Sequence, residues 1–301
     1  MKRALQALVA GAVDYAGLFP PASLDMPAAV ESYARYLRDT QSAMLGRFVA
    51  PVVRLREFDE AAASLLPRGQ DSQPWRLSAL SGPDLGADID LALRFNSRHE
   101  ADSEIGHAVI DALEVKVAAR DEIFAASSIA PPQFATFFEI PIGEDPAALI
   151  AAIARAGAFA KARTGGVTPT AFPTAADVAR FMMCCRDARV AFKLTAGLHH
   201  PLRAQYRLTY APDAPRGVMF GYLNMFVAAT LAWNGAGESL VSDCLLATDA
   251  RDFEFRDDAV TFRGTTIPTQ VVADSRANFI ISFGSCSFRE PVDELAELPV
   301  N

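Results

Sequence analysis

The sequence has few cysteines, no basic run and no long apolar run. Its four cysteines show no Cys-x-x-Cys spacing, and Cys184 and Cys185 are adjacent, which argues against a disulfide framework and against a zinc site. The formal net charge is −8, which disfavours a nucleic acid or an anionic membrane as the main partner. The apolar stretch 221–233 contains Asn224 and is too short to span a bilayer. These absences argue against a nucleic-acid-binding protein and against a membrane protein.

The first eleven residues carry a basic pair and then a short apolar stretch, which superficially resembles the start of a signal peptide. Gln6 interrupts that stretch and Asp14 follows it in place of a cleavage region. We therefore expect a first helix of the mature protein and a cytoplasmic location.

Short β-rich runs alternate with longer helical stretches along most of the 301 residues. Such alternation is typical of parallel βα units. Eight runs have the character of strands, and eight is the number that closes a barrel. We therefore predict one α/β domain over 1–301, a (β/α)8 TIM barrel. Its expected strands are 11–15, 47–53, 75–80, 112–117, 135–141, 159–163, 191–195 and 279–283.

The segment 203–278 does not follow the βα repeat. It contains two stretches of helical character, 218–233 and 238–248, and two short β-rich runs that turn at Asp257-Asp258. We predict an α+β insertion of two helices and a hairpin between strands seven and eight. The apolar part 220–226 also suits a subunit interface, which would make the protein a homodimer.

Two lysines lie inside apolar runs that otherwise have the character of buried strands. Each run leads into glycine, as Phe-Ala-Lys161-Ala-Arg-Thr-Gly-Gly166 and Ala-Phe-Lys193-Leu-Thr-Ala-Gly197. A buried cation is costly unless it is paired, neutralised or used in chemistry. The alternative is a pair of surface lysines at strand ends.

The alternation of side chains along a strand predicts which residues face the barrel axis. In the run 113–117 the apolar residues share one parity, so Glu114 and Lys116 should face inward. The next three strands extend this to an ion cluster near their carboxyl ends, where TIM barrels have active sites. Clustered cations depress one another's pKa and suit a lysine to Schiff-base formation with a carbonyl compound. A structural salt bridge is the alternative for any one member. The members are Glu114, Lys116, Glu139, Lys161, Arg163 and Lys193.

Turns rich in glycine and serine follow several of these strands. Backbone N–H groups and helix N-termini in such turns can hold an anion, and barrels commonly bind phosphate after strands seven and eight. Ordinary turn glycines are the alternative. The candidate substrate-binding or anion-binding residues are Arg163, Thr164, Gly165, Gly166, Thr195, Gly197, His199, His200, Gly284, Ser285 and Ser287.

Cys286, in Gly284-Ser-Cys-Ser-Phe288, is a candidate nucleophile. No ordered base is identifiable beside it in the sequence, which favours a buried or helix-capping thiol.

At these residues the sequence resembles the deoxyribose-phosphate aldolase family of class I aldolases, which are (β/α)8 barrels. The family's sixth-strand motif Lys-Thr-Ser-Thr-Gly is similar to Lys161-Ala-Arg-Thr-Gly165, and its seventh-strand motif Lys-x-Ala-Gly-Gly-(Ile/Val)-Arg is similar to Lys193-Leu-Thr-Ala-Gly-Leu-His-His200. Weaker similarities in the same order include Val13-Asp14-Tyr15 and Phe283-Gly-Ser-Cys-Ser287. The resemblance implies that Lys161 forms the Schiff base and that Lys193 lowers its pKa.

The chain departs from the family pattern at three places. The family has Glu-(Ile/Val)-Asp on strand four, with the Asp in proton transfer, whereas this chain has Glu114-Val115-Lys116. Leu198 replaces the second glycine of the phosphate loop, and His199-His200 replace the arginine region. The segment 203–278 is foreign to the compact family and suits a lid. Because a lysine cannot replace the acid on strand four, we expect either a different proton shuttle or a different reaction.

Three functions fit these observations. The first is a lyase for a small carbonyl or phosphorylated metabolite that needs no metal or other cofactor, with the catalytic residues Lys161, Lys193, Lys116, Glu114 and Glu139. The second is a metal-assisted lyase, isomerase or hydrolase that uses His199, His200, Glu139 and Glu114, although adjacent histidines seldom bind one ion. The third is a barrel that binds an anionic metabolite without turnover. The paired lysines favour the first.

Overall fold

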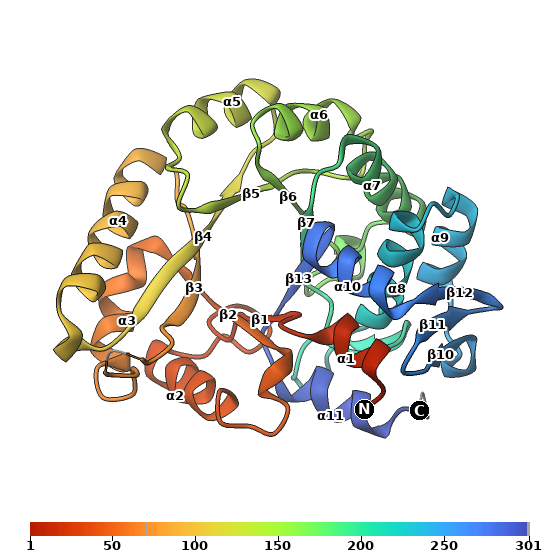
Figure 1. The fold of residues 1–301 in the computed structure, drawn as a ribbon, viewed down its shortest axis with the longest axis horizontal. Helices are drawn as coiled ribbons and strands as arrows, with labels where there is room; N and C mark the ends of the chain where they lie inside the picture. Colours follow the sequence, from red (N-terminus) through yellow and green to blue (C-terminus); the bar gives the residue numbers. More distant parts are fainter. Residues whose placement is uncertain (70, 300–301) are drawn as a thin grey trace.

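The computed structural model describes residues 1–69 and 71–299, apart from the side chain of Ser103. Eight parallel strands close into a barrel, with helices around them (Figure 1). Each strand pairs with its neighbours in sequence, and the last one closes the barrel by pairing with the first. The predicted (β/α)8 TIM barrel is confirmed. Its strands are β1 (Val13–Tyr15), β2 (Leu45–Pro51), β3 (Trp75–Leu80), β4 (Ala108–Lys116), β5 (Ala135–Glu139), β6 (Phe159–Arg163), β7 (Phe192–Thr195) and β13 (Ile280–Ser285).

The outer helices begin where side chains cap them. Asp25 accepts a hydrogen bond from the Ala28 N–H at the start of α2 (Met26–Tyr36), and Thr174 forms a capping box with Asp177 at the start of α7 (Ala175–Ala188). The other elements around the barrel are α1 (Arg3–Val9), η1 (Ser42–Met44), η2 (Val52–Arg54), α3 (Leu55–Ala62), α4 (Leu85–Ala101), η3 (Ser103–Ile105), α5 (Arg120–Ile129), α6 (Ala147–Arg155), η4 (Pro169–Ala171) and α11 (Arg289–Glu297).

The strands β3 and β6 have the predicted bounds, and the largest difference is at β4. This strand begins at Ala108, four residues before the predicted start at 112, because Ala108 pairs with Trp75 at the start of β3. The register of this pair shifts between Leu77 and Ser78. A shift of this kind breaks the period-two pattern on which the prediction depends.

The segment between β7 and β13 begins with an antiparallel hairpin of β8 (Ala204–Arg207) and β9 (Arg216–Met219). The sequence pattern gave no strand here, because both runs are short and largely polar. A three-stranded antiparallel sheet, with β11 in the centre, precedes the last helix of the segment. The remaining elements are α8 (Tyr222–Trp233), α9 (Glu238–Leu246), η5 (Ala250–Asp252), β10 (Phe253–Phe255), β11 (Ala259–Phe262), β12 (Thr265–Pro268) and α10 (Thr269–Asn278).

The apolar run 220–226 is buried inside the chain. Every residue of α8 from Tyr222 to Ala232 is buried, and the Tyr222 ring stacks on Phe283 of β13 with centroids 5.0 Å apart. The expectation that this run forms a subunit interface is therefore wrong, because the run packs on the barrel. Within the described ranges, no helix has the length and apolar character to cross a bilayer.

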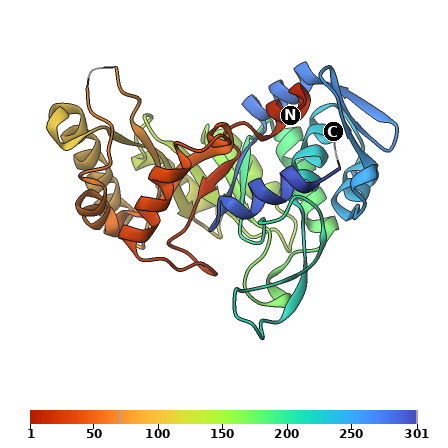
Figure 2. The same ribbon diagram turned by 90° about the horizontal axis from the view of Figure 1, so that it is seen from below.

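The loops at the carboxyl ends of the strands position the candidate site. Figure 2 shows the loop after β6 and the β8–β9 hairpin projecting from the same side of the barrel. Parallel strands all end at one face, so side chains from the last residues of several strands meet beneath these loops.

Candidate active site

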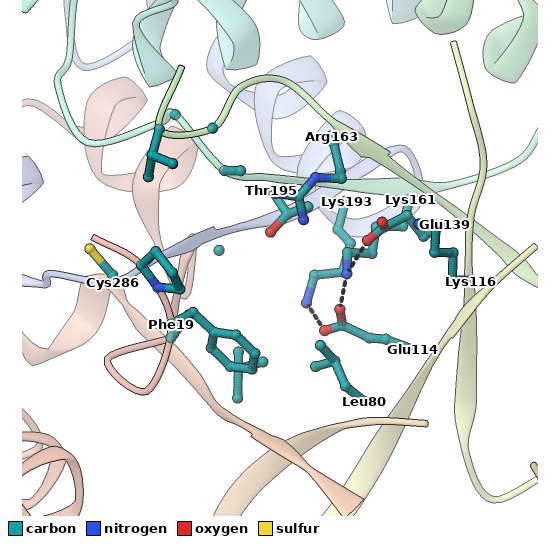
Figure 3. Close-up of a pocket in the computed structure, with 18 of the residues that line it drawn as sticks. Phe19, Leu80, Glu114, Lys116, Glu139, Lys161, Arg163, Lys193, Thr195 and Cys286 are labelled. Carbon is teal, nitrogen blue, oxygen red and sulfur yellow. Dashed lines mark hydrogen bonds and ion pairs between the residues drawn. The ribbon is translucent and has the colours of Figure 1, made fainter. Parts of the chain in front are cut away.

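Lys161 and Lys193 lie opposite each other on adjacent strands, β6 and β7. Their exposed fractions are 4% and 1%. Both side chains point into the barrel (Figure 3). They are not surface lysines at strand ends, and each ammonium group is bound by carboxylates.

Glu114 of β4 joins the two lysines. Its Oε2 is 2.5 Å from Lys161 Nζ, and its Oε1 accepts a hydrogen bond of 2.7 Å from Lys193 Nζ (Figure 3). Ser78 of β3, fully buried, donates a further hydrogen bond of 2.5 Å to Oε1. A single buried carboxylate therefore bridges both ammonium groups.

Asp14 of β1 completes the surroundings of Lys193. Its Oδ2 accepts hydrogen bonds from Lys193 Nζ at 2.5 Å and from Ser282 Oγ at 2.7 Å, and its Oδ1 accepts one from the Arg47 N–H at 2.8 Å. A Cβ on Gly46 would lie 2.4 Å from Oδ1, so glycine permits this close approach. Asp14 was not among the predicted site residues. A carboxylate inside the short apolar run of β1 is the signal that could have identified it.

Glu139 of β5 is the second partner of Lys161, with Oε2 2.7 Å from its Nζ. Two ammonium groups thus face three carboxylates, those of Asp14, Glu114 and Glu139. Glu139 is only partly buried, whereas Asp14 and Glu114 are buried. It is therefore the carboxylate of this group that is most open to solvent.

The paired charges set the protonation states. Burial raises the pKa of Glu114, but the charges of Lys161 and Lys193 outweigh it and hold that pKa well below its usual range. Burial likewise raises the pKa of Asp14, and Lys193 and Arg47 more than reverse the effect. Burial lowers the pKa of Lys193, but Asp14 and Glu114 raise it above its ordinary value. Lys193 is therefore a charged, carboxylate-bound lysine and not a bare cation beside Lys161.

Lys116 and Arg163 occupy the rim. Each is the last residue of its strand, β4 or β6, and each side chain is exposed although it lines the same cavity. Within the described part of the chain, neither has a carboxylate within 4.0 Å. All six predicted ions therefore line one cavity, but these two are exposed at its mouth.

Glu114 is the carboxylate of β4 that contacts the lysine pair, and Lys116 stands two residues after it. Glu114 contacts Lys161 directly, while Lys116 lies one inward position farther along the strand and pairs in register with Glu139. The replacement of an acid by Lys116 therefore removes no carboxylate from the lysine pair. It adds a cation to the rim.

The lysines form one wall of a cavity of about 480 Å³. Apart from His199, the charged residues of its lining are four cations and two carboxylates, a local excess of positive charge in a chain with net charge −8. The chain has only four lysines, and all except Lys2 line this cavity. The apolar part of the lining consists largely of Phe19, Pro20, Pro21, Val49, Leu80, Leu208 and Met219.

The predicted anion-binding residues divide into two groups. Thr164 is buried and donates a hydrogen bond of 2.9 Å to the Ala196 carbonyl, which ties the loop after β6 to the loop after β7. A Cβ on Gly165 would lie 2.9 Å from the Gly197 Cα, so these loops touch through glycine. Those that line the cavity are Arg163, Gly166, Thr195, Gly197, His199 and Gly284, and those outside its lining are Thr164, Gly165, His200, Ser285 and Ser287.

The adjacent histidines point to different partners. His200 Nδ1 is 2.7 Å from Glu294 Oε1, and its ring stacks on Tyr206. His199 instead faces Cys286 and Glu290. The structure thus supplies a base beside Cys286 that the sequence pattern did not show. In the described ranges, no three His, Cys, Asp or Glu side chains are grouped to hold a metal ion, and the four ligands considered for a metal site do not converge.

No protein-family model matches the sequence, and no curated protein matches it significantly. Among solved structures, a lysine/ornithine decarboxylase from Vibrio vulnificus, complexed with cadaverine, is similar with a TM-score of 0.43 and 11% sequence identity. The match covers 94% of this chain but only 58% of the decarboxylase chain.

Proposed function

We propose that this barrel is an enzyme in which the Lys161 amine forms a Schiff base with a small carbonyl compound, as in class I aldolases. The observation that carries the proposal is the position of the Lys161 side chain. It is buried in the wall of a cavity between two carboxylates, at 2.5 Å and 2.7 Å. A lysine so placed has proton acceptors within reach and a solvent-poor space for a substrate.

Lys193 suits a supporting role. It is bound by Asp14 and Glu114, and its Nζ lies 5.4 Å from the centre of the Phe137 ring, a second favourable contact for a cation. Its raised pKa keeps it protonated near neutral pH, and a protonated amine is not a nucleophile. Lys193 therefore fixes the position and charge of Glu114, which in turn orients Lys161.

The proposed reaction begins when Glu139 accepts a proton from Lys161. The free amine attacks the carbonyl carbon, and the C=O π electrons move to oxygen, which takes a proton from the attacking nitrogen to give a carbinolamine. Loss of the hydroxyl as water, with a proton from the same carboxyl group, leaves a protonated imine. This cation withdraws electrons from the neighbouring bond, so a carbon–carbon bond next to it can break or form. Glu114 stays ionised and stabilises the cation.

The cations at the rim of the cavity favour an anionic substrate. Lys116 and Arg163 are exposed, line the cavity and lack a carboxylate partner among the described residues. A carboxylate or phosphate on the substrate would supply one, and a guanidinium group matches either anion with two parallel hydrogen bonds. Arg163 lies two residues from Lys161 on the same face of β6, about 7 Å along the strand. An acidic group close to the reacting carbonyl is therefore favoured.

The test is reductive trapping. The protein is incubated with glycolaldehyde, pyruvate or dihydroxyacetone phosphate, reduced with borohydride, and mapped by peptide mass spectrometry. We expect an adduct on Lys161 with at least one compound, and none in Lys161→Arg, which retains the charge but is not expected to form an imine. Lys2 is the internal control, because it is exposed and outside the cavity.

Two results would contradict the proposal. One is the absence of an adduct with every compound. The other is labelling of Lys161 no faster than Lys2, which would mean that the buried amine has no special reactivity. Saturable binding of pyruvate or dihydroxyacetone phosphate without any adduct would favour a barrel that binds a metabolite without turnover.

A further inference from the structure

A second group of reactive side chains lies across the cavity from the lysines. Cys286 follows directly after β13, is 5% exposed and lines the cavity. Figure 3 shows it on the opposite side of the open space from Glu114 and the lysines, beyond Phe19. The proposed amine chemistry makes no use of this side.

His199, from the loop after β7, approaches the thiol. Its Nδ1 is 3.9 Å from Cys286 Sγ, 3.3 Å from Ser285 Oγ and 3.4 Å from Glu290 Oε2. The imidazole is 8% exposed and also lines the cavity. One ring nitrogen therefore faces the thiol, a hydroxyl and a carboxylate together.

Tyr210, from the loop between β8 and β9, closes the other side of the thiol. Its hydroxyl lies 3.6 Å from Cys286 Sγ and donates a hydrogen bond of 2.9 Å to Glu290. Burial lowers the pKa of His199, but the contacts with Cys286 and Glu290 outweigh it and raise the pKa to about 9. An imidazolium beside a thiol favours the thiolate, which is the nucleophilic form.

The other three thiols differ in all these respects. Burial raises the pKa of Cys185 and of Cys244, and neither lines the cavity. Cys184 is partly exposed on α7, also outside the cavity, and burial raises its pKa as well. Cys184 thus provides a more accessible thiol for comparison.

We propose that Cys286 and His199 form a thiolate–imidazolium pair that reversibly binds an aldehyde group in the cavity. The sulfur attacks the aldehyde carbon, and the C=O π electrons move to oxygen, which takes the proton held by His199. The product is a hemithioacetal and a neutral imidazole. Return of the proton and cleavage of the C–S bond release the aldehyde unchanged, so no oxidant or further reactant is needed.

The pair gives the cavity a second position for a carbonyl compound. An aldehyde bound at Cys286 lies across the cavity from the Lys161 amine, where a second reactant or a cleavage product would be retained. The thiol chemistry does not depend on imine formation, so it can be tested whether or not Lys161 reacts.

The first experiment measures alkylation of each cysteine of the native protein by iodoacetamide at pH 7, with peptide mass spectrometry. We expect Cys286 to react at least tenfold faster than Cys184, although it is less exposed. His199→Gln should slow this reaction at least tenfold. His200→Gln is the matched control and should change it less than twofold, because that ring contacts Glu294 and Tyr206 instead.

The second experiment uses [1-¹³C]glycolaldehyde and carbon NMR. A saturated-carbon signal of a hemithioacetal should appear with the native protein and with Cys184→Ser, and should be absent with Cys286→Ser. An imine at Lys161 gives an unsaturated-carbon signal, so the two adducts are distinguished. Alkylation of Cys286 no faster than Cys184, no effect of His199→Gln, or no thiol-dependent signal would each overturn the proposal.

Discussion

Replacement of Glu114 by Gln tests whether one carboxylate holds the lysine pair together. The amide has nearly the same shape and can still contact Ser78, but it removes the negative charge that lies 2.5 Å from Lys161 Nζ and 2.7 Å from Lys193 Nζ. Asp14 and Glu139 then face two ammonium groups alone. The variant should therefore fold with lower stability.

The size of the stability loss in Glu114→Gln follows from the burial of the ion pairs. Removal of one partner from a buried ion pair costs about 3–5 kcal/mol, because the remaining charge stays desolvated. The lower end applies here, since Lys161 retains Glu139 and Lys193 retains Asp14. For 301 residues the entropy of unfolding is about 0.6 kcal/mol/K. A loss of about 3 kcal/mol therefore lowers the melting midpoint by about 5 °C.

The measurement is thermal and urea unfolding at pH 7, followed by circular dichroism. Glu57→Gln is the control, because Glu57 pairs with Arg54 at the surface and its loss should leave the midpoint unchanged. A Glu114→Gln midpoint equal to that of the unmodified chain would refute the reasoning. It would mean that desolvation of the carboxylate cancels its attraction to both lysines.

Three further outcomes are expected. The pKa values of Asp14 and Glu114 are lowered in the folded chain, so below about 3.8 and 4.5 the unfolded chain binds more protons than the folded chain. The free energy of unfolding, measured by urea titration, should therefore fall as the pH drops below these values and recover above them. Gly165→Ala places a Cβ 2.5 Å from the Phe172 ring and should cost about 1–3 kcal/mol in the same assay, whereas Gly143→Ala, with no atom within 4 Å, should cost little. Arg163→Met should raise the pyruvate concentration for half-maximal trapping about tenfold, because a charged hydrogen bond is lost, and should leave trapping of glycolaldehyde unchanged; equal effects on both would contradict a role in anion recognition.

The barrel could be predicted because its signal is local. Most of the strands are short apolar runs that are followed by a helix, and the count of eight limits the ways in which the runs can pair. The bounds of β4 could not be predicted, since its first residues are defined by pairing with β3 across a register shift. The β8–β9 hairpin was missed for a similar reason, because two short polar runs become strands only by pairing with each other.

The site was predictable only in part. Lys161 and Lys193 are visible in the sequence because a lysine in an apolar strand needs an explanation. Asp14 is far from both in sequence and meets Lys193 only when β1 closes the barrel beside β13. The contact of His199 with Cys286 likewise joins the loop after β7 to the end of β13.

The sequence by itself determined the eight βα units, the inward direction of both lysines and the presence of carboxylates on β4 and β5, since these depend on local period and composition. Only the tertiary structure decided which charge meets which. Barrel closure brought Asp14 to Lys193, placed Glu114 between the two lysines, and left Lys116 and Arg163 at the rim. The physical reason is that an ion pair forms only when two charged groups lie within a few ångströms of each other. The sequence of one strand does not determine its distances to the other strands.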